Sequence, residues 1–169
     1  MEIEPAEHGR LKVKAEVFDL NGPINDFVYE IRIDNEVVAS RSVSGRNKMT
    51  IFIPYGYNCA LIFKAADYHM KFLMIDTKTE CEWLPRRTLY EFDIELYPEL
   101  LFEGLDTDIL DFPCGIVRLD NETGEFDFTS TYNQNIKKEY AALIKQAYQR
   151  DRMAARLEDD VPGHPTNKP

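Results

Sequence analysis

Apolar and polar residues alternate along much of the first hundred positions. The clearest runs are 11–17, 27–33 and 90–96, where every second residue is apolar. A period of two is that of a β-strand with one buried and one exposed face. Similar runs, each bounded by turn residues, lie at 37–43, 49–53, 57–63 and 68–75. Strand signals at this regular, short spacing predict an antiparallel β-sandwich or barrel, and we favour the sandwich.

The pattern changes after Pro98. An additional β-hairpin is expected where residues 116–119 and 125–128 flank a turn that ends in Gly124. Apolar residues then recur at spacings of three and four, which predicts a C-terminal α-helix that Thr129 or Ser130 can cap. The helical stripe consists of Tyr132, Ile136, Tyr140, Leu143, Ile144 and Ala147. We favour packing of this helix on a sheet of the same chain over docking on a partner.

These elements give a single mainly β domain with short additions. The predicted organisation is a flexible arm over 1–9, a β-sandwich over 10–98, an acidic loop and hairpin over 99–130, a helix over 131–157 and a disordered tail over 158–169. The tail has no pattern of residues that could be buried in a core.

Charge disfavours two classes of partner. The net charge is −10. Residues 131–169 contain seven Lys/Arg and five Asp/Glu, so residues 1–130 carry −12. An acidic body repels nucleic acid and anionic membranes. The sequence also lacks an apolar run long enough for membrane insertion.

Residues capable of chemistry are few, so we expect no enzyme and no cofactor. The three histidines are His8, His69 and His164, and only His69 falls in a predicted strand. A Ser-His-Asp or Cys-His arrangement would have to be built on this one residue. Recognisable hydrolase, metalloprotease, dinucleotide and phosphate-loop motifs are missing.

Cysteines and carboxylates leave two open questions. The three cysteines are too few for a disulfide framework, although a bridge between Cys81 and Cys114 stays open in an oxidising compartment. The acidic residues at 91, 93 and 95 read as the solvated face of a strand rather than as a glycosidase pair. Those at 106, 108 and 111 resemble part of a calcium loop but lack the Gly and the distal Glu of an EF-hand.

The best binding candidates are aromatic. Trp83 is the only tryptophan and lies in a charged loop, a typical setting for an interface anchor. Tyr55, Tyr57 and Tyr68 could join it in a platform for a sugar or a peptide. The alternative, which we favour for the tyrosines, is that their rings pack in the core with the hydroxyls at the rim.

Several segments resemble a known family. They are the end of the first strand at 19–24, the hairpin VYEIRIDNEVVAS at 28–40 and the stretch IFIPYGYNCALIFKAADYHMKFLMIDT at 51–77. This part of the chain resembles the carboxypeptidase-regulatory-like (transthyretin-like) β-sandwich, and so implies an immunoglobulin/transthyretin-like fold. The later segments EFDIELYPE and DFPCGIVRLDNETGEFDFTSTYNQNIKKEY are similar to uncharacterised cell-envelope proteins of the Bacteroidetes group.

The resemblance implies a secreted or periplasmic protein without catalysis. We therefore expect a non-enzymatic binding or structural module that contacts a protein partner in the bacterial cell envelope. The contact would use an edge strand, the helix or the Trp83 loop. The alternative is a carbohydrate-binding accessory domain built on Trp83 and the tyrosines. Residues Met1 to Arg10 do not read as a signal peptide, so a cytoplasmic location stays open.

Overall fold

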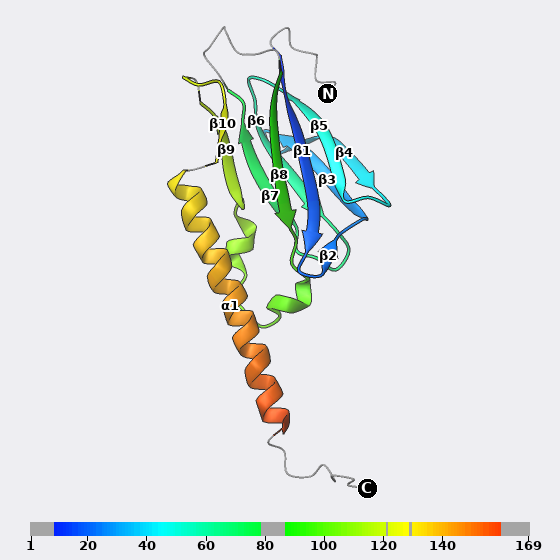
Figure 1. The fold of residues 1–169 in the computed structure, drawn as a ribbon, viewed down its shortest axis with the longest axis vertical. Helices are drawn as coiled ribbons and strands as arrows, with labels where there is room; N and C mark the ends of the chain where they lie inside the picture. Colours follow the sequence, from blue (N-terminus) through cyan, green and yellow to red (C-terminus); the bar gives the residue numbers. More distant parts are fainter. Residues whose placement is uncertain (1–8, 79–86, 121, 129, 160–169) are drawn as a thin grey trace.

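The computed structural model describes residues 9–78, 87–120, 122–128 and 130–159 as two β-sheets and one C-terminal helix (Figure 1). The four-stranded sheet contains β1 (Arg10–Asp19), β2 (Gly22–Pro23), β5 (Lys48–Pro54) and β8 (Arg87–Glu95). The six-stranded sheet contains β3 (Phe27–Ile33), β4 (Glu36–Val43), β6 (Asn58–Lys64), β7 (Lys71–Asp76), β9 (Gly115–Leu119) and β10 (Phe126–Asp127). The helix α1 covers Thr131–Asp159, close to the predicted range. The predicted mainly β architecture is therefore confirmed.

The alternating residues pack between the sheets. On β1, Leu11, Val13, Ala15 and Val17 are buried, whereas the residues that alternate with them are partly exposed. The buried residues of β3, β5, β6, β7 and β9 belong to the same core. Burial of this apolar surface is the main favourable contribution to folding, at about 25 cal/mol per Å².

Two strand pairs depart from the expected antiparallel arrangement. β8 runs parallel to β1, and β9 runs parallel to β7. Parallel neighbours need a long connection, and both pairs have one. β8 follows β1 only after the intervening strands, and the chain between β7 and β9 passes through β8 in the other sheet. Local alternation predicts strands but not the direction of pairs so distant in sequence.

The sixth predicted strand is shorter than expected. β7 covers Lys71–Asp76, and Tyr68 lies before it in a turn. Asp67 adopts a positive φ of 66°, which interrupts the extended chain. Tyr68 instead forms an isolated bridge to Pro98, so this turn is tied to the chain that follows β8.

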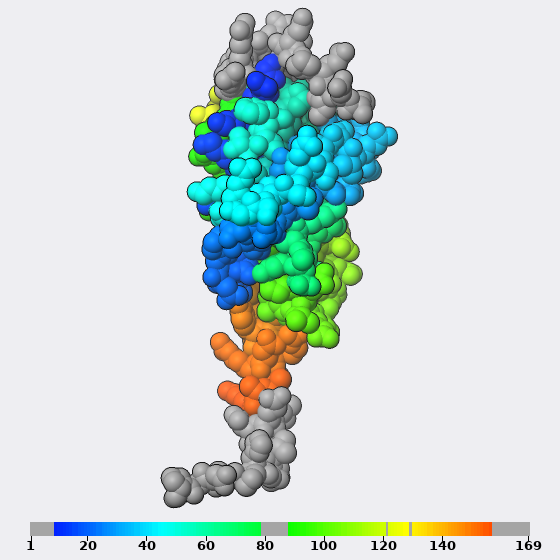
Figure 2. Space-filling model, turned by 90° about the vertical axis from the view of Figure 1, so that its right-hand side faces the viewer, coloured from blue at the N-terminus to red at the C-terminus, as the bar shows by residue number. Residues whose placement is uncertain are grey.

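The segment at 99–112 contributes to a second core that the sequence pattern did not indicate. It contains two short 3-10 helices, η1 (Glu99–Phe102) and η2 (Asp108–Asp111). Their residues Phe102 and Leu110 are buried against the inner face of α1. The preferred intramolecular packing of the helix is therefore observed. The last turns of α1 project beyond the body of the molecule (Figures 1 and 2).

Candidate functional site

Strand β8 pairs with a neighbouring strand on one side only. It forms a long parallel ladder with β1 and pairs with no other strand in the described part of the chain. The six-stranded sheet, by contrast, continues past β7 with β9 and β10. These strands and α1 lie to one side of β8 in Figure 1. As far as the described residues go, the sandwich therefore has an open edge at β8.

Within the described ranges, the backbone at this edge has hydrogen-bonding groups without a partner. Just after β8, the N–H of Leu96 donates to the carbonyl of Phe18 at 2.9 Å. In a parallel ladder, successive residues direct their backbone groups to opposite sides. The N–H and C=O groups of Leu89, Glu91 and Asp93 consequently point away from β1. Among the described residues, no hydrogen bond to these backbone groups is present.

A groove runs between this edge and the helix, and we call it the β8–α1 groove. Its volume is about 480 Å³, within the roughly 300–1,000 Å³ typical of ligand sites. Its lining is mostly apolar and aromatic. The lining residues are Phe18, Lys71, Leu73, Tyr90, Phe92, Asp93, Ile94, Glu95, Tyr97, Cys114, Phe128, Asn133, Lys137, Tyr140, Ala141 and Ile144.

Two lysines line the groove, Lys137 on α1 and Lys71 on β7, and Lys71 lies among aromatic side chains at one end. Its Nζ donates to the backbone carbonyl of Glu95 at 2.8 Å. The same atom lies 4.8 Å from the ring centroids of both Tyr97 and Tyr140. Burial lowers the pKa of Lys71, because the charged form loses solvation. No ion pair between Lys71 and a described carboxylate is present.

The two tyrosines that face Lys71 differ in their hydrogen bonds. The hydroxyl of Tyr97 donates to the Glu95 carboxylate at 2.9 Å. The hydroxyl of Tyr140 is buried and has no hydrogen-bond partner among the described residues. Burial raises the pKa of both phenols, so both are neutral donors near pH 7. The Tyr140 hydroxyl is therefore a buried donor without an acceptor in the described part of the chain.

Cys114 adds a partly buried thiol to the same groove. Cys114 and Cys59 are free cysteines, and Cys81 lies outside the described residues. Burial raises the pKa of Cys114 to about 11 and that of Cys59 to about 12. A thiol is a nucleophile only as the thiolate, so neither side chain is activated for catalysis.

Asn133 holds the helical wall of the groove in place. Its side chain is buried, accepts from the N–H of Ile116 at 2.7 Å and donates to the carbonyl of Ile116 at 2.8 Å. A third bond runs from its amide to the carbonyl of Phe128 at 2.7 Å. The helix begins just before it, where the Ser130 hydroxyl accepts the Asn133 N–H at 3.3 Å. The start of α1 is thus bound to both β9 and the end of the hairpin.

The structure does not gather the tyrosines predicted from the sequence into one platform. Tyr55 is buried, and its hydroxyl lies 2.6 Å from the hydroxyl of Thr88. Tyr57 is partly buried at the same end of the sandwich. Tyr68 lies at the other end, where its hydroxyl donates to Asp19 at 2.5 Å. Trp83, the remaining candidate, lies outside the described residues.

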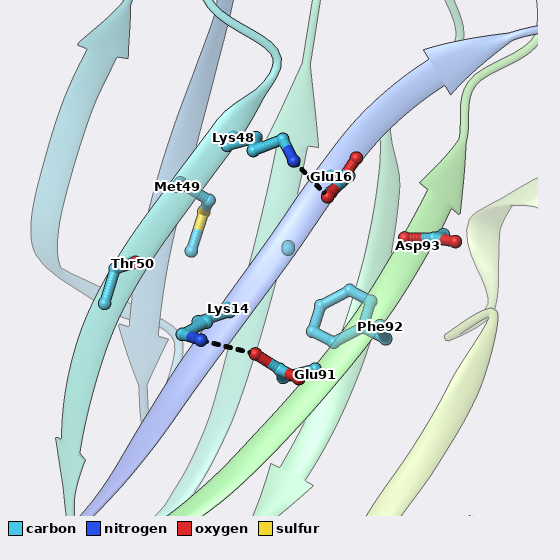
Figure 3. A pocket seen from close by; sticks show the side chains of 9 residues that line it. Lys14, Glu16, Lys48, Met49, Thr50, Glu91, Phe92 and Asp93 are labelled. Carbon is cyan, nitrogen blue, oxygen red and sulfur yellow. Dashed lines mark hydrogen bonds and ion pairs between the residues drawn. The ribbon is translucent and has the colours of Figure 1, made fainter.

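The outer face of the four-stranded sheet has a second hollow, of about 670 Å³, shown in Figure 3. Four of its charged side chains form two pairs that face each other across neighbouring strands. Lys14 pairs with Glu91 and Lys48 pairs with Glu16, each at 2.6 Å. These exposed pairs read as a solvated strand face, as expected for Glu91 and its neighbours.

Other candidates for chemistry have no supporting geometry. His69 is partly buried, and its ring lies 5.7 Å from that of Phe102. No ion pair between His69 and a carboxylate of the described residues is present. Within the described ranges, no group of three or more His, Cys, Asp or Glu is arranged to hold a metal ion. The acidic residues of 106–111, which resemble part of a calcium loop, lie within these ranges and form no such group.

Sequence reasoning missed the groove, although one signal of it was present. Leu73 and Ile75 face the core, so the period of two places Lys71 in the same inward row. A lysine at an inward strand position is unusual and marks a site that needs explanation. Tyr140 was recognised only as part of an apolar helical stripe. Nothing in the sequence indicated that it would meet Lys71.

Comparisons with known proteins give no family. No protein-family model matches the chain, and no curated protein matches it. A solved structure of catechol 1,2-dioxygenase from an Acinetobacter species, inhibited by bound mercury, aligns with a TM-score of 0.41 and 13% identity. The alignment covers 67% of this chain and 59% of that one. A similarity this weak supports no conclusion about activity. Within the described chain, no helix is both long and apolar enough to cross a membrane.

Proposed function

We propose that the protein is a non-enzymatic binding module that takes an extended segment of a partner protein along the free edge of β8. The observation that carries this proposal is the unpaired side of β8 beside an apolar groove. Strand addition to an open sheet edge is a common mode of peptide recognition. Main-chain hydrogen bonds give affinity in this mode, and pockets for alternate side chains give specificity.

Both requirements have counterparts in the β8–α1 groove. The outward backbone groups of Leu89, Glu91 and Asp93 supply donors and acceptors for an added strand. The inward side chains Tyr90 and Phe92 line the groove and would face alternate residues of that strand. An exposed edge with these properties invites pairing unless a natural partner covers it.

The setting proposed for this interaction is the bacterial cell envelope. The proposal rests on the resemblance of 11–77 to the transthyretin-like β-sandwich and of the later segments to envelope proteins. We also propose the transthyretin-like class for the sandwich itself. Its two packed sheets agree with that class at the level of architecture.

Selection from random eight-residue peptides displayed on phage tests the proposal. Selected peptides, synthesised and titrated by calorimetry, are expected to protect the amides of Leu89, Glu91 and Asp93 from hydrogen exchange. Asp93→Pro removes one outward N–H without touching the ladder to β1, and proline is tolerated on edge strands. We expect this variant to bind the peptides at least about tenfold more weakly, the effect of a lost hydrogen bond plus a steric block.

Asp93→Ala is the matched control, because it removes the same carboxylate but keeps the N–H. It should bind within about twofold of the unmodified protein. The proposal fails if no peptide is selected, or if selected peptides bind without protecting these amides. Equal binding to the proline and alanine variants would also contradict it. The exchange measurement uses the unmodified protein, so it decides the matter even if Asp93→Pro does not fold.

A further inference from the structure

We propose that the segment bound in the β8–α1 groove carries an aspartate or glutamate whose carboxylate pairs with Lys71 and accepts the hydroxyl of Tyr140. This inference rests on the proposed strand addition and names the chemistry of the segment. It follows from two groups in one groove: among the described residues, the Lys71 ammonium has no ion pair and the Tyr140 hydroxyl has no hydrogen-bond partner.

The first group is the ammonium of Lys71. Lys71 is partly buried, and a charge withdrawn from water is normally paired, because a counter-charge offsets much of the lost solvation. Lys71 has a carbonyl and two aromatic rings around it, but no ion pair with a described carboxylate is present. The charge of the Glu95 carboxylate acts to raise the pKa of Lys71, but this carboxylate forms no ion pair with Lys71 and accepts a hydrogen bond from Tyr97.

The second group is the hydroxyl of Tyr140. Its side chain is 7% exposed, lines the groove and has no hydrogen-bond partner among the described residues. A buried hydroxyl of this kind is destabilising by about 1–3 kcal/mol unless an acceptor is present. Most buried polar groups in proteins do have a partner, so each exception calls for an explanation such as a missing ligand.

A single carboxylate can pair with the Lys71 ammonium and accept the hydrogen bond of the Tyr140 hydroxyl. Its two oxygens offer about four lone-pair sites, so it can accept from an ammonium and a phenol together. Nζ lies over the ring that carries this hydroxyl, 4.8 Å from its centroid, so both donors belong to the same end of the groove. The phenol stays protonated because its pKa is raised, so it remains a donor.

The position of Lys71 places the acid within the bound strand. Lys71 donates a hydrogen bond to the backbone carbonyl of Glu95, the last residue of β8. Lys71 therefore lies at one end of the groove. Side chains of an added strand that face inward would meet Tyr90 and Phe92 first and Lys71 last. The expected pattern is apolar, any, apolar, any, acidic, read toward the Glu95 end in whichever direction the segment runs.

General electrostatics would not produce this preference. Residues 1–130 carry a net charge of −12, so the body of the protein repels acidic peptides at a distance. If the selected peptides are enriched in Asp or Glu at one inward position, a local contact in the groove is therefore the cause. This makes the composition of selected peptides informative by itself.

The test uses the peptides selected on phage and their matched amides, with Glu replaced by Gln or Asp by Asn. In the unmodified protein the acid form is expected to bind at least about tenfold more tightly than the amide, as for hydrogen bonds to a charged group. In Lys71→Met this ratio should fall to near one, and in Tyr140→Phe it should fall several-fold. Lys145→Met makes the same substitution at an exposed position of α1 outside the groove and should leave the ratio unchanged.

The possible results distinguish a failure of the carboxylate inference from a failure of the proposed strand addition. The carboxylate inference is wrong if the selected peptides lack an acid at the inward position, or if their acid and amide forms bind equally. Either result would be compatible with strand addition. The same holds if Lys71→Met and Lys145→Met behave alike. A failure to select any peptide overturns both. If Lys71→Met does not fold, the ratio in Tyr140→Phe, which keeps the ring in the core, decides the outcome.

Discussion

The ammonium group of Lys71 lies over the ring of Tyr140, 4.8 Å from its centroid, and joins a strand of the six-stranded sheet to the C-terminal helix. A cation over an aromatic ring is attracted by the negative face of the ring. Tyr97 presents a second ring to the same cation at the same distance. The contact thus links the edge of the sandwich to the helix at the point where the groove is most polar.

Removal of the Tyr140 hydroxyl should not weaken the free protein. Tyr140→Phe keeps the ring and its contact with Lys71 but removes a buried donor that finds no acceptor in the described part of the chain. We expect the free energy of unfolding to stay unchanged or to rise by about 1 kcal/mol, because the desolvation cost disappears. Chemical unfolding in urea measures this directly.

Tyr97→Phe is the matched comparison for this change. The Tyr97 hydroxyl does have an acceptor, the Glu95 carboxylate at 2.9 Å. We expect its loss to lower the free energy of unfolding by about 1 kcal/mol. A larger loss in Tyr140→Phe than in Tyr97→Phe would show that the Tyr140 hydroxyl is satisfied within the free protein, and would remove one support of the proposed carboxylate site.

Asn133 should be far more sensitive to substitution than its neighbours on α1. Asn133→Ala leaves two carbonyls and one N–H, on Ile116 and Phe128, without the partner they have now. We expect a loss of about 3 kcal/mol in the free energy of unfolding. Asn135→Ala, at an exposed position two residues later, should change it by less than about 0.5 kcal/mol. Equal effects in urea unfolding would refute the assigned role.

Cys114 should be slow to react in the folded protein. Its pKa of about 11, against an ordinary 9.0, makes the thiolate fraction at about pH 8 roughly 100-fold smaller. Alkylation with iodoacetamide, followed by peptide mapping, should label it at least that much more slowly than in urea. Because the thiol lines the groove, a bound peptide should slow labelling further. Rapid labelling of the folded protein would mean that this end of the groove is open to water.

Much of the fold could be predicted from the sequence because its signals are local. Alternation located β1, β3 and β8, and the change of period at residue 131 located α1. Pairing direction was not predictable in the same way. The partner of β8 is β1, more than seventy positions earlier, and no property of either segment alone states that they run parallel.

The candidate site could not be predicted from the sequence, because it depends on where the four-stranded sheet ends. The groove exists because the four-stranded sheet ends at β8 while β9, β10 and α1 continue beyond it. Tyrosines were chosen from the sequence for being aromatic, but Tyr55 is part of the core. The informative residue was Lys71, a charge in an inward row, and its meaning appeared only with Tyr140 in place.

The final prediction concerns Gly115, which allows the ring of Phe128 to lie against β9 at the wall of the groove. A Cβ on residue 115 would lie 2.3 Å from Cε2 of Phe128 and 3.2 Å from Cδ1 of Leu73, so the ring would have to move. Phe128 is 40% exposed and its ring can swing outward. We therefore expect Gly115→Ala to lower the free energy of unfolding by only about 1–2 kcal/mol, the usual cost of overpacking.

The same change should alter peptide binding, because Phe128 lines the groove. Selected peptides are expected to bind Gly115→Ala several-fold more weakly. A double-mutant cycle with Phe128→Leu isolates the cause, since residues in contact show non-additive effects. If the collision is with this ring, the stability cost of Gly115→Ala should be smaller in the Phe128→Leu background by about 0.5–1 kcal/mol. If the stability costs of the two substitutions are additive, the added Cβ collides with Leu73 rather than with Phe128. Phe128 would then not be part of the wall of the binding site.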